Sequence, residues 1–229
     1  MHLYHHASPA VKRVRWACAN LISAMAHTHS QSVDMVLVAF EILDRYICSG
    51  VELPPTDPPN VVMALSGVIA ILASKTTEAE NVLDVDDLTM FCGRRLGMTL
   101  VAAELEVANR IGFAFPTPAA GYFFEEVVGR SASPVTRSLA AYYSEFAIAS
   151  PLLLQYSPML LIAASTEMAR SAARCLDWVR SPCGHSPAMI SHAAGAIWDA
   201  TRGITPGNCL IMKQLPRAHL DMAHEAGCR

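Results

Sequence analysis

Four charged residues stand at positions where the surrounding pattern is apolar, which makes them the first candidates for a structural or binding role. Arg15 lies on the apolar stripe of one helical segment, and Asp44 interrupts the apolar end of the next. Burying a charge is expensive unless it is paired or faces a partner. Because Arg15 and Asp44 have opposite charges, we predict that they pair inside the protein. The other two are Lys75 and Glu104.

Lys75 and Glu104 each have a second interpretation as ordinary solvent-exposed residues. Lys75 ends the most apolar segment of the chain, where the negative end of the helix dipole favours a cation. Glu104 stands among Val101 and Leu105 in a later helical segment, whose exposed face could carry it. Spacing and charge alone do not decide between solvent and a partner protein for these two.

Motifs for nucleophilic or phosphate chemistry do not occur in the sequence. It contains no GxSxG elbow and no glycine-rich phosphate loop with a lysine, so we predict a protein that is not an enzyme and has no cofactor. His27 and His29 lack clustered cysteines or carboxylates at zinc spacing, which predicts no metal site. A magnesium site at Asp84–Asp87 is conceivable, but acidic residues that open a helix account for this run.

The composition indicates a folded protein that does not bind nucleic acid through its phosphates. Of the 229 residues, 52% are hydrophobic and 16% charged, and the net charge is −3. Seven cysteines without CxxC spacing are typical of reduced thiols, and no segment resembles a signal peptide. The longest apolar run, 61–73, is too short to span a membrane. We therefore expect an intracellular protein, in the nucleus or cytoplasm, with no nucleic-acid or membrane partner.

Apolar residues recur at a spacing of three to four, which predicts helices throughout and no strands. Ser32 is the expected N-cap of the second helix, and the nearly all-apolar third helix is expected to be central. Pro116 and Pro118 cannot continue the helix before them. The predicted helices cover residues 9–27, 32–48, 60–76, 84–94, 99–111, 134–149, 160–170, 188–202 and 215–226.

The second half of the chain partly repeats the pattern of the first. LSGVIAILASK in the third helix is answered by LLIAASTEMAR at 160–170, and an amphipathic helix precedes each of the two. The repeat predicts two bundles of about five helices, with boundaries at 1–115 and 116–229. The second bundle is expected to be degenerate, because residues 178–187 leave little room for a full helix.

These segments resemble the cyclin family, most closely its A and B mitotic types, over most of the chain. MVLVAFEILDRYI, with Asp44 and Arg45, resembles the family's second helix, and LSGVIAILASK, which ends at Lys75, resembles the third. Glu104 follows Lys75 by 29 residues (104 − 75), which is the family's interval without a gap. IGFAFPTP resembles the link between the two cyclin boxes, and QYSPMLLIAAS the third helix of the second box.

The resemblance implies a regulatory subunit that binds and activates a cyclin-dependent protein kinase in the cell cycle. It implies a cyclin-like fold, a heterodimer with the kinase, and contacts from Lys75 and Glu104 to the kinase's C helix. Phe113 and Phe115 would add apolar contact beside them, and Arg15 with Asp44 would be the internal ion pair of the fold.

One of the departures from the family pattern keeps a second interpretation open. Thr76, expected in the kinase contact next to Lys75, stands where many members carry an aromatic residue. A cyclin-fold adaptor that binds a peptide or another partner without activating a kinase, or a transcription-related relative, is therefore the alternative. The acidic net charge disfavours a DNA-binding version of that alternative.

Overall fold

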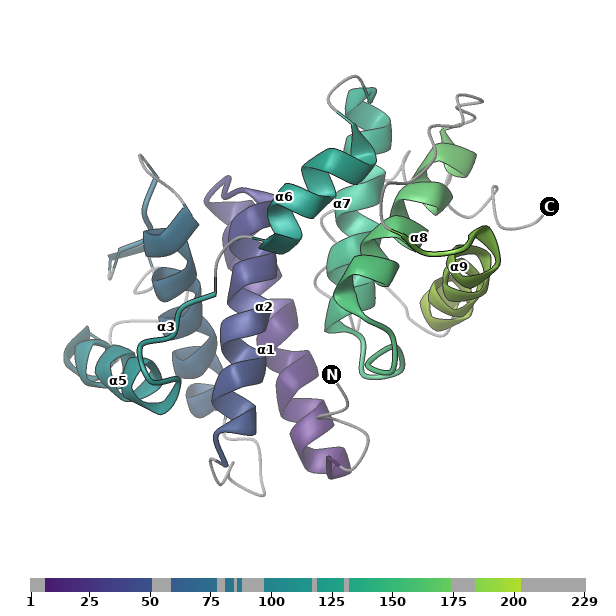
Figure 1. The fold of residues 1–229 in the computed structure, drawn as a ribbon. Coiled ribbons are helices and arrows are strands. Elements are labelled where there is room, and N and C mark those ends of the chain that lie inside the picture. The colour runs from purple at the N-terminus through teal and green to yellow at the C-terminus, as the bar shows by residue number, and fades with distance from the viewer. Residues whose placement is uncertain are drawn as a thin grey trace. The chain divides into compact units, whose positions relative to one another are not determined.

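The computed structural model describes residues 7–50, 59–77, 81–84, 86–87, 97–116, 119–129, 132–173 and 184–202. Every regular element within these ranges is an α-helix, as the sequence predicts (Figure 1). The chain divides into two compact units, Leu3–Gly121 and Tyr122–Arg229. Each unit is described by itself below.

The first two helices begin at serine caps whose side chains accept a hydrogen bond from the backbone. In α1 (Pro9–Thr28), Val11 N donates to Ser8 Oγ at 3.3 Å, and Pro9 takes the first helical position. In α2 (Val33–Cys48), Met35 N donates to Ser32 Oγ at 3.2 Å, as expected from the sequence. A serine at this position satisfies one of the free N–H groups at a helix start.

Helix α3 (Pro59–Thr77) is the centre of the first unit, as its composition predicts. All ten residues from 65 to 74 are buried, because α1, α2 and α5 (Gly97–Arg110) all pack against this helix (Figure 1). A helix with apolar residues on every side has to be covered on every side. The burial ends at Lys75, which is exposed.

An ion pair inside the first unit joins α1 to α2. Arg15 Nε donates to Asp44 Oδ1 at 2.7 Å, and Arg15 Nη2 donates to Asp44 Oδ2 at 3.0 Å. The side chain of Arg15 is 2% exposed and that of Asp44 is 20% exposed. Two parallel N–H···O bonds are the strongest geometry available to an arginine and a carboxylate. The charge on the apolar stripe of α1 is therefore neutralised by α2.

The second unit is built on α7 (Pro134–Ala149), α8 (Pro158–Ala172) and α9 (Pro187–Arg202). Helix α8 packs against both of the others. Serine caps recur at α7 and α8, where Thr136 N and Leu160 N donate to Ser133 Oγ and Ser157 Oγ at 3.1 and 3.2 Å. The bounds of α7 are those predicted from the sequence.

Two parts of the sequence-based layout differ from the structure or lie outside it. Helix α6 (Ala119–Val128) begins at the end of the first unit and was not predicted as a separate helix, because the prolines before it indicate a boundary and not the start of a helix. The expected helix at 84–94 lies mostly outside the described residues, and the one at 215–226 lies entirely outside them.

Two buried tyrosines have hydroxyl groups that titrate above their usual range. Burial raises the pKa of Tyr143, which is 2% exposed, well above the ordinary value of 10.0. Burial also raises the pKa of Tyr46, and the nearby carboxylate of Glu106 adds to the effect. In both cases the folded protein favours the neutral phenol, because desolvation penalises the charged form.

Removing the carboxylate of the internal pair should destabilise the fold more than removing a surface carboxylate. We expect Asp44→Ala to cost about 3 to 5 kcal/mol in the free energy of unfolding, because it removes the carboxylate that accepts two hydrogen bonds from a buried guanidinium. Glu125→Ala is the matched control, since the Arg137–Glu125 pair is 34% and 47% exposed and should contribute less than about 1 kcal/mol. Urea unfolding followed by circular dichroism measures both, and equal costs would contradict a structural role for Asp44.

The tyrosines predict how stability changes at alkaline pH. The stabilisation that comes from the raised tyrosine pKa is fully present below pH 10 and is lost as the pH rises toward the pKa of the folded state. Between these two pH values only the unfolded chain releases the phenol proton. Each such phenol should lower stability by up to about 1.4 kcal/mol per pH unit there. Tyr143→Phe should flatten the decline, whereas Tyr122→Phe, at a side chain 72% exposed, should not. Melting temperatures between pH 9 and 11 give the slopes.

Candidate functional site

The two charged residues that the sequence left undecided meet on the surface of the first unit. Lys75 Nζ, from the last turn of α3, donates to Glu104 Oε1 of α5 at 2.6 Å. The lysine side chain is 49% exposed and the glutamate 20% exposed. A pair this exposed contributes little to stability, about 0 to 1 kcal/mol. Both groups are therefore able to exchange partners at small cost to the fold.

Hydroxyl groups around Lys75 satisfy the carbonyls at the end of α3. Thr76 and Thr77 both donate through Oγ1 to Ala73 O, at 2.8 and 2.9 Å, and Ser74 Oγ donates to Ile71 O at 2.9 Å. Thr76 is exposed and adjacent to Lys75. These bonds terminate the helix in a defined way. The position of Lys75 is thus fixed by the buried helix before it and by a satisfied C-terminus.

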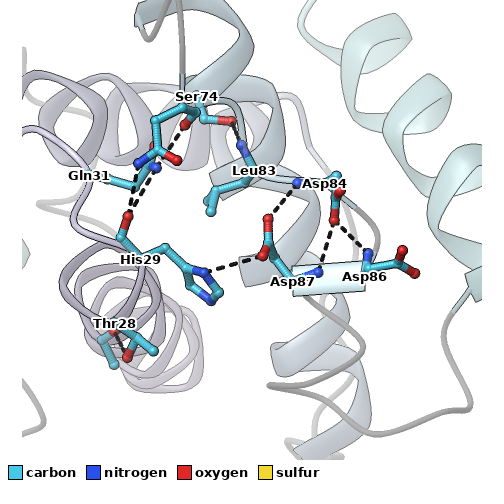
Figure 2. Close-up of polar contacts among 10 residues, drawn as sticks. Thr28, His29, Gln31, Ser74, Leu83, Asp84, Asp86 and Asp87 are labelled. Atoms are coloured by element: carbon cyan, nitrogen blue, oxygen red, sulfur yellow. Dashed lines mark hydrogen bonds and ion pairs between the residues drawn. The ribbon is translucent and has the colours of Figure 1, made fainter.

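A cluster of polar contacts, shown in Figure 2, ties the segment after α3 to the turn between α1 and α2. Leu83 N donates to Ser74 Oγ at 3.1 Å, which attaches this segment to the end of α3. Gln31 Nε2 donates to Asn81 O at 2.8 Å, and Asn81 Nδ2 donates to His29 O at 3.0 Å. These contacts join residues about 50 positions apart, so the local sequence pattern does not predict them.

The acidic residues Asp84, Asp86 and Asp87 form a helix cap in which side chains and backbone N–H groups bond to each other in both directions. Asp86 N and Asp87 N donate to Asp84 Oδ1 at 2.8 and 3.0 Å, and Asp84 N donates back to Asp87 Oδ2 at 3.0 Å (Figure 2). His29 Nδ1 lies 3.3 Å from Asp87 Oδ1. This arrangement is a capping box with aspartate in the third position, so the carboxylates of Asp84 and Asp87 already accept hydrogen bonds from the backbone of the same segment. Within the described residues, no group of three or more metal-ligating side chains is assembled.

The two phenylalanines of the link follow the end of α5 directly and differ in exposure. Phe113 is 57% exposed and has a φ of 54°, in the left-handed region, next to Gly112 with a φ of 63°. Phe115 is half-buried. Phe113 therefore presents much of its ring to solvent, and Phe115 presents less.

Arg45 holds the backbone between these two aromatic residues. Its Nη1 donates to Ala114 O at 2.5 Å, and its Nη2 donates to Glu41 Oε1 at 2.7 Å, one turn earlier on α2. In the sequence, Arg45 stands out only as part of an Asp-Arg pair that resembles the family's. Its contact across 69 residues has no signature in local spacing.

Helix α5 also exposes apolar side chains beside Glu104. Val101 is 64% exposed and Leu105 is 56% exposed, and they are one helical turn apart. Val107 and Ala108, on another face of the helix, are buried. We call Lys75, Glu104, Val101, Leu105 and Phe113 the α3–α5 surface. It combines a charged pair with exposed apolar groups, which is the composition of a protein-binding surface, with polar groups for orientation and apolar area for affinity.

None of the described helices is both long and apolar enough to cross a membrane. No protein-family model matches the sequence, and no curated protein matches it. Likeness to known proteins comes from solved structures.

Two solved structures illustrate the likeness. The chain is similar to a viral cyclin from herpesvirus saimiri, with a TM-score of 0.70 and 13% sequence identity, over 83% of this chain and 85% of that chain. It is also similar to a chain of the CAK complex from Chaetomium thermophilum bound to ATP-gamma-S, with a TM-score of 0.48 and 18% identity, over 93% of this chain and 66% of that chain.

The likeness to the viral cyclin covers most of both chains, and at 13% identity it establishes the fold and nothing further. The all-helical architecture of the described residues agrees with it. The protein has an all-α, cyclin-like fold.

Proposed function

We propose that this protein is a cyclin, the regulatory subunit of a cyclin-dependent protein kinase. The observation that supports it best is the Lys75–Glu104 pair at the surface, 49% and 20% exposed, which joins α3 to α5 beside the exposed apolar side chains Val101 and Leu105. The cyclin-like fold, together with the resemblance of the sequence motifs to the cyclin family, suggests the class of partner. In this proposal the chain forms a heterodimer with its kinase, acts in the cell cycle, and works in the nucleus or cytoplasm.

In this proposal the α3–α5 surface receives the C helix of the kinase. Lys75 and Glu104 bind polar groups of that helix, and Phe113, Phe115 and the exposed face of α5 supply apolar area. Thr76 lies at the edge of the contact. Charged groups that pair at the centre of an interface fix its register, and the apolar residues around them exclude water.

The chain would perform no chemistry, hold no cofactor or metal, and bind neither nucleic acid nor membrane. Its effect would come from binding the active conformation of the kinase more tightly than the inactive one. Kinase catalysis needs the C-helix glutamate to pair with a strand lysine, so a partner that holds the C helix inward completes the active site. Moving a kinase from about 1% to 99% active requires about 5.5 kcal/mol of differential affinity.

The two cyclin boxes are assigned to residues 1–115 and 116–229 in this proposal. The first box carries the kinase contact, because Lys75, Glu104 and Phe113 all belong to it. Arg15 and Asp44 stabilise that box internally and would take no part in activation, since the arginine is buried.

A second candidate is a cyclin-fold adaptor that binds a partner without activating a kinase. The observation that favours it is Thr76, which is exposed beside Lys75 and offers no aromatic surface there. The two candidates differ in one measurable respect. Under the first, a purified cyclin-dependent kinase gains histone phosphorylation activity when the chain binds; under the second, it does not.

The proposal predicts that removing the charged pair strongly weakens kinase binding and leaves the fold intact. The double variant Lys75→Ala, Glu104→Ala should weaken capture of a purified cyclin-dependent kinase about 100-fold, or about 2.7 kcal/mol. Its melting temperature should stay nearly unchanged, because an exposed pair contributes at most about 1 kcal/mol to folding. A panel of purified cyclin-dependent kinases, tested by surface plasmon resonance and circular dichroism, provides the measurement.

The control removes a second exposed ion pair without changing the net charge. Arg137→Ala with Glu125→Ala does this in the other unit, where the pair is 34% and 47% exposed. It should leave kinase capture as it is in the unaltered chain. If instead the Lys75 and Glu104 double variant unfolds, or binds as tightly as the unaltered chain, the role assigned to the pair is wrong.

A further inference from the structure

The link after α5 contains more left-handed backbone than a helix end requires. Gly112 N donates to Asn109 O at 3.0 Å, and Phe113 N donates to Ala108 O at 2.8 Å. This is the Schellman pattern, in which one left-handed residue, here Gly112 with a φ of 63°, terminates the helix. Phe113, with a φ of 54°, is a second left-handed residue in the link. Backbone sterics disfavour this conformation for a residue with a bulky side chain.

The position of the Phe113 ring does not compensate for this backbone. A residue after a Schellman turn commonly packs its side chain back onto the last turn of the helix. The Phe113 side chain is 57% exposed, so much of its apolar area stays in water. Strained backbone persists only where the surroundings over-determine it, and such positions concentrate at ligand-contacting sites.

Arg45 supplies the constraint that holds this conformation. Its guanidinium donates through Nη1 to Ala114 O, the carbonyl directly after Phe113, at 2.5 Å. Glu41 accepts from Nη2 at 2.7 Å and so fixes the orientation of the planar guanidinium. Phe115 N closes the turn by donating to Phe113 O at 3.0 Å. The rigid, buried helix α2 is thereby connected to the exposed end of the link.

We propose that Arg45 is a positioning residue, which holds Phe113 in its left-handed conformation and presents its ring to the kinase. This inference rests on the proposed function and adds to it a residue that does not touch the partner. Arg45 and Glu41 are 40% and 42% exposed, so their pairing contributes little to folding by itself. The pair instead orders the link before the partner binds. Less conformational entropy is then lost on binding.

The first test needs no partner and measures the link directly. Amide hydrogen exchange of Phe113, Ala114 and Phe115 should accelerate at least 10-fold in Arg45→Lys, because a lysine has no planar fork to bridge Ala114 O and Glu41. Exchange of amides in α2 and α3 should be unchanged. Unaltered exchange in the link would overturn the proposal, and so would faster exchange throughout the unit, which would show a general loss of stability.

The second test measures coupling on the kinase that the unaltered chain binds from the purified panel. Arg45→Lys should weaken binding about 10-fold in the unaltered chain, and should have no further effect when Phe113→Ala is already present. Independent, additive losses would show that Arg45 does not act through Phe113 and would overturn the proposal. A merely structural role would not produce this dependence on the ring.

A third test compares two variants to measure the backbone strain at Phe113. Phe113→Gly and Phe113→Ala both remove the ring, but only glycine adopts a φ of 54° without strain. The glycine variant should melt at a higher temperature than the alanine variant, and a lower or equal temperature would argue against a strained Phe113. If no kinase in the panel binds the unaltered chain, the proposed function fails, whereas the exchange and melting results still decide whether Arg45 orders the link.

Discussion

The burial of α3 on all sides is the constraint on which the first unit depends. Ten consecutive residues, from 65 to 74, are buried by three neighbouring helices, so the helix cannot rotate or slide without exposing apolar area or opening a cavity. Lys75 is the next residue after that stretch. Its position relative to α5 therefore follows from core packing, and the contact with Glu104 needs no strong interaction of its own to form.

The cost of burying charge separates the charged residues of this unit into two groups. Arg15 is 2% exposed and has both Asp44 oxygens as acceptors, an arrangement that pays for desolvation with two short hydrogen bonds. Lys75 is 49% exposed and pairs with the carboxylate of Glu104, which belongs to a different helix. The first pair is suited to specifying how α1 and α2 pack, and the second to meeting another molecule.

Local pattern in the sequence was enough to predict most helices, and the reasons are visible at single residues. Ser32 and Ser133 cap their helices through hydrogen bonds that span three positions, so short-range spacing encodes them. The Arg45 contact with Ala114 and the contacts among His29, Gln31 and Asn81 span 50 to 69 positions, and no periodicity encodes them. The left-handed Phe113 was also unpredictable, because a φ of 54° runs against the backbone preference of phenylalanine and the neighbouring carbonyl of Ala114 is bonded by that distant arginine.

Because the Lys75 ammonium and the Glu104 carboxylate already neutralise each other, an approaching molecule encounters a dipole there in place of a net charge. The field of a dipole declines with distance faster than that of a monopole, and salt at physiological strength screens it within about 8 Å. Long-range electrostatic guidance toward this spot is thus weak. If this surface binds the kinase as proposed, recognition there depends on short-range shape and on the exchange of one set of hydrogen bonds for another.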